Sequence, residues 1–139
     1  MNTNEHKEEA EGVLLTRRII GCAMRVHNTL GAGFLEKVYE NALTHELNKN
    51  GIAVEQQKTI KIFYDDVLIG SCVADLIIEG RVLLELKATT GLADEHIAVC
   101  LNYLRVTKIP VCLLVNFGKP RLQIKRLVGD TYTDISDPI

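Results

Sequence analysis

The sequence predicts an α/β domain with a mixed central sheet of about four to five strands flanked by helices. Apolar residues recur every three or four positions over residues 13–30 and 34–49, which is the spacing of one helix face. After Gly51 the period changes to two, which indicates strands. A third helical pattern at 92–106 precedes the apolar run 111–115, and this order suggests a crossover between two strands of the sheet.

The first two helices are defined by their apolar faces and by the glycines that end them. The first face is formed by Leu15, Ile19, Cys22, Val26 and Leu30. Gly31, Ala32 and Gly33 then interrupt the pattern. The second helix, over residues 34–49, is expected to end at Asn50-Gly51, which is a good carboxyl-terminal stop.

Three consecutive antiparallel strands are expected next. Residues 60–64 alternate apolar and other side chains, Asp65-Asp66 form a turn, and residues 67–78 run extended. Glu79-Gly80 breaks the chain, and residues 82–87 return as a strong strand with two charges in its second half. These charges are the first candidates for chemistry.

The remaining pattern sets the expected domain limits. Residues 122–127 alternate apolar with basic side chains, which predicts a last edge strand. A length of 139 residues with 47% hydrophobic content fits one domain. We therefore expect a flexible polar amino terminus over 1–12, a single domain over 13–128 and a polar carboxyl-terminal tail over 129–139.

Composition restricts the classes of partner. The 16 Lys and Arg against 18 Asp and Glu give a net charge of −2, so the chain as a whole does not attract nucleic acid or anionic membrane. A polyanion must meet a local basic patch. The candidates are Lys108, Lys119, Arg121, Lys125 and Arg126, with Arg17, Arg18 and Arg25 as a second cluster, and solvated surface charges are an equally good interpretation.

The four cysteines and the lack of a long apolar run indicate a cytoplasmic protein. The cysteines stand apart in apolar stretches without zinc-ligand spacing, so buried free thiols are expected, with a Cys72–Cys112 bridge as the lesser alternative. No stretch approaches the ~18 apolar residues that a membrane span needs. We expect no membrane partner.

Asp75, Glu85 and Lys87 form the candidate catalytic group. Residues two apart on a strand share a face, so Glu85 and Lys87 project side by side from a strand of Val and Leu. Asp75 is likewise an acid inside an apolar segment. A three-residue loop centred on Gly80 would place Asp75 opposite Glu85, whereas a two-residue turn would oppose it to Leu84 and require a bulge. We expect the first geometry or its bulged equivalent.

Two adjacent carboxylates repel each other unless a cation lies between them, and Mg²⁺ accepts carboxylate oxygens together with waters. The pair therefore predicts a hard divalent metal, Mg²⁺ or Mn²⁺. A neighbouring lysine would hold or help deprotonate the attacking water and stabilise charge on a phosphate. Asp, Glu and Lys in this arrangement suit the hydrolysis of phosphodiester bonds.

The chain resembles the small bacterial and archaeal proteins named for a GxxExxY motif, which are placed in the PD-(D/E)XK nuclease superfamily. The resemblance covers roughly residues 13–127. It is carried, in order, by Gly31-Ala-Gly33-Phe-Leu-Glu36-Lys-Val-Tyr39-Glu40, Val73-Ala74-Asp75, Glu85-Leu86-Lys87-Ala88, Leu101-Asn102-Tyr103-Leu104 and Val115-Asn116-Phe117-Gly118. A Glu-x-Lys triplet alone is common by chance, but the ordered set is specific.

The resemblance implies a restriction-endonuclease-like core in which Asp75 and Glu85 bind metal, the Leu86 carbonyl adds a ligand and Lys87 serves the water. It also implies that Glu36, on the second helix, assists the metal, whereas Glu40 is expected to be a solvated helix charge.

Four further residues are expected around this group in supporting positions. Tyr39 is expected to pack in the core with its hydroxyl hydrogen-bonded. His96 is expected to be a helix-end or surface histidine in preference to a metal ligand. Asn102 and Tyr103 are expected to have supporting or structural roles. The family commonly has a Gln three residues after this His, and Val99 occupies that position here.

We therefore expect a metal-dependent nuclease acting on DNA or RNA, and the superfamily suggests a homodimer as one arrangement. The alternative is a catalytically weak or inactive module with the nuclease fold that binds nucleic acid or a protein partner, for which Val99 is the reason. A third alternative is a structural domain in which Glu85 and Lys87 form a salt bridge and Asp75 caps a bend.

Overall fold

The computed structural model describes residues 3–129 and 131–135. The chain forms three helices and six strands within these residues. Their order is α1 (Thr3–Leu30), α2 (Glu36–Lys49), β1 (Val54–Tyr64), β2 (Val67–Ile78), β3 (Val82–Lys87), α3 (Asp94–Thr107), β4 (Val111–Asn116), β5 (Gln123–Val128) and β6 (Thr131–Ile135).

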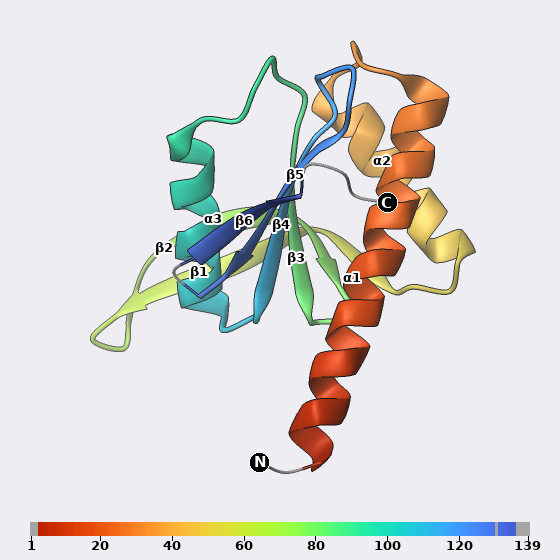
Figure 1. The fold of residues 1–139 in the computed structure, drawn as a ribbon. Helices are drawn as coiled ribbons and strands as arrows, with labels where there is room; N and C mark the ends of the chain where they lie inside the picture. The colour runs from red at the N-terminus through yellow and green to blue at the C-terminus, as the bar shows by residue number, and fades with distance from the viewer. Residues whose placement is uncertain (1–2, 130, 136–139) are drawn as a thin grey trace.

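The six strands form one mixed sheet in the order β1-β2-β3-β4-β5-β6. Only β3 and β4 are parallel, and α3 is the crossover that joins them. Every other neighbouring pair is antiparallel. Figure 1 shows α1 and α2 on one face of the sheet and α3 on the other. This architecture confirms the restriction-endonuclease-like fold expected from the sequence, with more strands than the four to five predicted.

The sheet separates two hydrophobic cores. The larger core packs α1 and α2 against one face and includes Ile19, Leu43 and Leu84. The smaller core packs α3 against the other face through Ile97, Cys100 and related residues. Strand β3 contributes to both, because its alternate side chains point to opposite faces. Leu83 therefore belongs to the α3 core. Glu85 and Lys87 lie two and four positions after Leu83, so their side chains are on the same face of the strand.

The register of the β2–β3 hairpin decides whether the two acids meet. Leu76 pairs with Leu84 and Ile78 with Val82, so Gly80 is the middle of a three-residue loop. Glu79 and Gly80 both have positive φ, at 55° and 65°. This is the first of the two geometries weighed from the sequence. It brings residues 75 and 85 to equivalent positions just beyond the last ladder pair.

Both ends of the chain contain more regular structure than the sequence pattern predicts. Helix α1 begins at Thr3, ten residues before Val13. Strand β6 lies within the expected polar tail and pairs with β5, so β5 is not the edge strand that was predicted. Residues 1–2, 130 and 136–139 of the expected termini lie outside the described residues.

All four cysteines are free thiols, and Cys22, Cys100 and Cys112 are buried. The alternative Cys72–Cys112 bridge is therefore not formed. None of the helices in residues 3–129 has the length and apolar composition to cross a membrane.

Candidate active site

Asp75 and Glu85 meet where the β2–β3 ladder ends. The backbone N–H of Asp75 donates to Oε1 of Glu85 at 3.2 Å, and the backbone N–H of Leu86 donates to Oδ2 of Asp75 at 2.8 Å. Each carboxylate thus satisfies a backbone N–H of the opposite strand in place of a ladder bond. This reciprocal pairing uses one oxygen of each acid.

Burial makes the charged form of both acids unfavourable. Burial raises the pKa of Glu85 from 4.5 to about 8, and the charge of Asp75 is the next cause. Burial also raises the pKa of Asp75, and the hydrogen bond from Leu86 opposes this effect. The charge of Lys87 lowers the pKa of both carboxyls, so its ammonium group lies within electrostatic range of the pair. Asp75 and Glu85 therefore meet, and the charge of Lys87 acts on both.

The position of Leu86 indicates where its carbonyl points. The N–H and C=O of one residue in a strand point to the same neighbouring strand. Because the Leu86 N–H meets Asp75 on β2, the Leu86 carbonyl also faces β2, beyond the last ladder pair. This agrees with its expected place beside the two acids.

The acid that α2 brings to this region in buried form is Glu40, not Glu36. Glu36 is exposed at the first turn of α2, and its charge is near enough to raise the pKa of Glu85. Glu40 is only 4% exposed, and its charge raises the pKa of Asp75. The expectation that Glu40 is a solvated helix charge is therefore wrong. Its burial depends on partners distant in the sequence.

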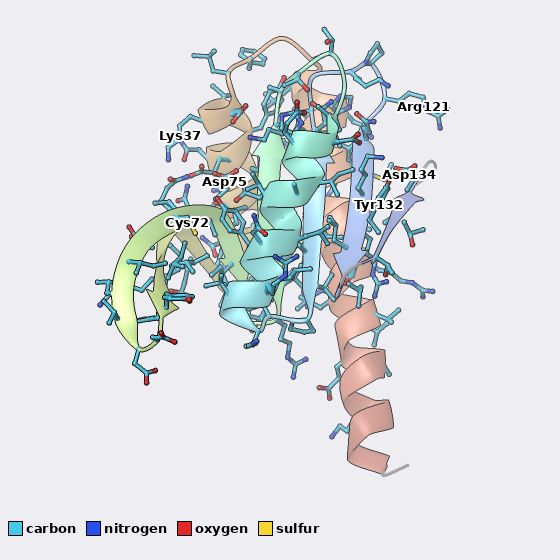
Figure 2. The ribbon with its side chains drawn as sticks, turned by 90° about the vertical axis from the view of Figure 1, so that its left-hand side faces the viewer. Lys37, Cys72, Asp75, Arg121, Tyr132 and Asp134 are labelled. Atoms are coloured by element: carbon cyan, nitrogen blue, oxygen red, sulfur yellow. The ribbon has the colours of Figure 1, made fainter. Side chains whose placement is uncertain are left out.

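Those partners include two glutamines of β1 that the sequence did not single out. Gln57 Nε2 donates to Oε1 of Glu40 at 2.6 Å, and Gln56 Nε2 donates to Oε2 at 2.8 Å. Lys37 Nζ pairs with the same Oε2 at 2.8 Å. Figure 2 labels Lys37 and Asp75 on this side of the molecule. The local sequence around Gln56 and Gln57 does not indicate that their amides will contact an acid on α2.

Tyr39 is a core residue, as expected. It is fully buried, and its ring stacks on Phe117 with ring centroids 4.6 Å apart. The hydroxyl donates to the Gly31 carbonyl at 2.5 Å and accepts the Phe34 N–H at 3.2 Å. Tyr39 therefore fixes the glycine-containing turn that leads into α2.

The expected supporting residues of α3 lie in different surroundings. His96 Nδ1 accepts the Ala93 N–H at 3.0 Å, so this histidine caps the start of α3. Asn102 is exposed and accepts a hydrogen bond from Arg105. Tyr103 donates to the Val73 carbonyl at 3.2 Å, and burial followed by the charge of Glu85 raises its pKa. Tyr103 is therefore near enough to the acids for their charges to act on it.

The loop after Lys87 is held by the loop after β4. Asn116 is fully buried and exchanges hydrogen bonds with the backbone N–H and C=O of Thr89. It also accepts the Gly118 N–H. The Phe117 N–H donates to the Lys87 carbonyl at 2.8 Å. A Cβ at Gly118 would lie 2.3 Å from Thr89 N, so this close approach requires glycine.

In the first cluster of basic residues considered for phosphate binding, three residues line a cavity of about 500 Å³ near β5 and β6, in which Lys125 pairs with Asp134, whereas Lys108 lines a separate cavity at the end of α3. In the second cluster, Arg18 donates to the Asn50 carbonyl and Arg25 pairs with Glu46. These contacts occupy charges that a phosphate would need.

No curated protein and no solved structure is significantly similar to this chain. The family model of the PD-(D/E)XK nuclease superfamily matches residues 14–127, which include every strand from β1 to β4 and the three residues Asp75, Glu85 and Lys87. This chain therefore belongs to the PD-(D/E)XK nuclease superfamily.

Proposed function

We propose that this protein is a divalent-cation-dependent nuclease, with Asp75 and Glu85 as the cation ligands and Lys87 beside them. The observation that carries the proposal is the reciprocal hydrogen bonding of the half-buried Asp75 and the buried Glu85 at one end of the sheet, where the charge of Lys87 acts on both carboxyls. The site lies at the carboxyl end of β3, one of the two parallel strands, and such ends commonly hold the ligands of α/β proteins. Superfamily membership supports nucleic acid as the substrate.

The residues present fit a hard cation. The N–H groups of Leu86 and Asp75 each engage one carboxylate oxygen, which leaves Glu85 Oε2 and, beside its 3.4 Å contact with the Gln57 amide, Asp75 Oδ1 to face a cation. Among residues 3–129 and 131–135, no three His, Cys, Asp or Glu side chains are grouped closely enough to hold a metal. A site with two carboxylates, a backbone carbonyl and water suits Mg²⁺ or Mn²⁺, because Mg²⁺ usually keeps several waters. Glu36 would act through such a water.

Each residue then has a distinct role. A bound cation would polarise a phosphate oxygen and make its water more acidic. Asp75, Glu85 and the Leu86 carbonyl would bind and orient it. Lys87 would hold the attacking water and stabilise negative charge on the phosphate. The buried surroundings of Glu85 exclude bulk water, which strengthens these electrostatic interactions.

We also assign the chain to the GxxExxY proteins within the superfamily. Gly33, Glu36 and Tyr39 supply the motif, and the structure gives two of these residues a physical role. Tyr39 fixes the turn before α2, and Gly33 has a φ of 117°, which favours glycine. The motif thereby sets the position of α2, which carries Glu36 and Glu40 toward the acids.

Cleavage assays with a matched pair of variants test the proposed function. Purified protein is incubated with single- and double-stranded DNA and RNA, with Mg²⁺, with Mn²⁺ and with a chelator. We expect cation-dependent cleavage, and Asp75→Asn should lower it by at least about 10³-fold because it removes a ligand charge. Asp66→Asn is the control, since Asp66 lies exposed in the β1–β2 turn and its positive φ of 61° suits Asn.

Two outcomes would contradict the proposal. The nuclease assignment fails if the wild type cuts none of these substrates with either cation, or if Asp75→Asn cuts as fast as the wild type. Calorimetry with Mn²⁺ separates the alternative function. Binding of nucleic acid without affinity for the cation would identify a binding module that keeps the nuclease fold.

A further inference from the structure

Gln57 lies in an unusual backbone conformation directly beside the proposed cation site. Its φ is 51°, although it is not glycine and lies inside strand β1. The pairs Gln56–Leu76 and Lys58–Ala74 flank it, which places Gln57 opposite Asp75. A non-glycine residue in the left-handed region is energetically unfavourable and persists only when its surroundings impose it.

The side-chain amide of Gln57 bridges two acids. Its Nε2 donates to Oε1 of Glu40 at 2.6 Å and lies 3.4 Å from Oδ1 of Asp75. An amide nitrogen carries two hydrogens, so one can serve each carboxylate. Oδ1 is the Asp75 oxygen that Leu86 leaves available. Gln57 therefore touches the atom that the proposed function assigns to the cation.

Glu40 determines which end of the amide faces Asp75. An amide can rotate to present either its nitrogen or its oxygen, and only the nitrogen donates. Glu40 is buried, and its carboxylate oxygens require donors. The short hydrogen bond from Gln57 Nε2 to Glu40 keeps the amide nitrogen on the side that faces Glu40 and Asp75. The carbonyl oxygen of the amide, which would repel Asp75, is thereby directed away.

We propose that Gln57 is a positioning residue for cation binding, which holds Asp75 Oδ1 toward the cation while Glu40 fixes the orientation of the Gln57 amide. This inference rests on the proposed function. A carboxylate oxygen has two acceptor positions, so one hydrogen bond from Gln57 leaves the second for a cation. Residues that orient metal ligands in this way contribute to metal affinity without contacting the metal.

Gln56 provides a matched control on the adjacent position. Its amide also donates to Glu40, at 2.8 Å, and it contacts Asn41. The structure shows no hydrogen bond between Gln56 and Asp75, since its strand partner is Leu76. Substitution of either glutamine removes a hydrogen-bond donor to Glu40, but only substitution of Gln57 also removes the contact with Asp75.

The experiment compares Gln57→Leu and Gln56→Leu by two measurements. The first is the Mn²⁺ dissociation constant from calorimetry, which Gln57→Leu should raise by about 10- to 100-fold and Gln56→Leu should change far less. The second is the ¹H–¹⁵N chemical shift of the Leu86 backbone amide without cation. Leu86 donates to Asp75, so its shift should move in Gln57→Leu and stay in place in Gln56→Leu.

The two measurements distinguish failure of this inference from failure of the proposed function. If the wild type does not bind Mn²⁺, the proposed function fails, and the Leu86 shift still decides whether Gln57 orients Asp75. The inference is overturned if Gln57→Leu matches the wild type in that shift, or if Gln56→Leu produces equal changes. Should Gln57→Leu fail to fold, Gln57→Gly replaces it, because glycine adopts positive φ without strain.

Discussion

At the scale of single residues, Glu85 links the site to the pH dependence of folding. Burial and then the charge of Asp75 raise the pKa of Glu85 in the folded protein from 4.5 to about 8. Between these values the folded state binds more protons than the unfolded state. We therefore expect the free energy of unfolding of the cation-free protein to fall as pH rises from about 4.5 to about 8.

Urea unfolding at several pH values in the presence of a chelator measures this trend. Glu85→Gln should flatten it, because glutamine cannot ionise and retains a similar volume. Glu95→Gln is the control, since Glu95 is exposed in the first turn of α3. A wild-type stability that rises over this interval, or a variant that keeps the full slope, would contradict the assigned burial of the Glu85 charge.

The residues of the site differ in how far the sequence could predict them. Asp75 and Glu85 are separated by one hairpin, so strand period and loop length were enough to predict that they meet. Glu40 is different, because its burial arises from contacts with Gln56 and Gln57, 16 and 17 positions away. A helix surface pattern cannot indicate that a strand from elsewhere will cover one of its charges.

At the scale of elements, the two loops at the carboxyl ends of β3 and β4 depend on Gly118. A methyl group there would lie 2.3 Å from the N and O atoms of Thr89, and both are backbone atoms that have little room to move. We expect Gly118→Ala to lower the free energy of unfolding by about 1–3 kcal/mol. Chemical denaturation measures the change.

Gly12→Ala is the matched control for this substitution. Gly12 lies inside α1, and a Cβ there would meet nothing within 4 Å. Alanine has the higher helix propensity, so this variant should gain up to about 1 kcal/mol. Equal changes in the free energy of unfolding for the two variants would show that the two loops can move apart. Gly118 would then not be required to hold the loop that follows Lys87.

The face of α3 that carries Tyr103 leads to a prediction about rate. Val99 lies one turn before Tyr103 and is 42% exposed, at the position where the GxxExxY proteins that this sequence resembles commonly have Gln. Tyr103 contacts the Val73 backbone two residues from Asp75. Val99→Gln would place an amide on the helix face that carries Tyr103, and we expect faster cleavage at saturating Mn²⁺.

Initial rates of cleavage measure this effect against Val106→Gln. Val106 lies one turn after Tyr103, is similarly exposed and receives the same change in polarity. An equal response of both variants would mean that a general surface effect, not an amide at position 99, changes the rate. Unchanged rates in Val99→Gln would show that this chain does not use that position.

The elements themselves were predictable where an apolar face packs on the sheet. The helical period of α3 and the apolar run of β4 predicted the crossover, which the parallel β3–β4 pairing confirms. Strand β6 was missed because four of its five residues are exposed, so burial imposes no apolar alternation on it. Residues 3–12 of α1 carry no apolar face either, and their helix continues one that is nucleated by the packed part.

At the scale of the whole molecule, the site joins elements that are separate in sequence. Gln57 comes from β1, Asp75 from β2, Glu85 and Lys87 from β3, and Glu40 from α2. Figure 1 shows β3 inside the sheet with helices on both faces. A ligand bound by these residues therefore ties the amino-terminal helices to the sheet centre.

This arrangement predicts that a bound cation stabilises the entire domain. Unfolding separates the two acids and so destroys the site, and a ligand that binds only the folded state adds RT ln(1 + [L]/Kd) to its stability. At 100 times the dissociation constant of Mn²⁺ the gain should be about 2.7 kcal/mol, with a rise of several degrees in melting temperature. Thermal unfolding with and without Mn²⁺ measures it. Asp75→Asn should melt at one temperature in both conditions, whereas an equal rise in that variant would place the cation elsewhere on the molecule.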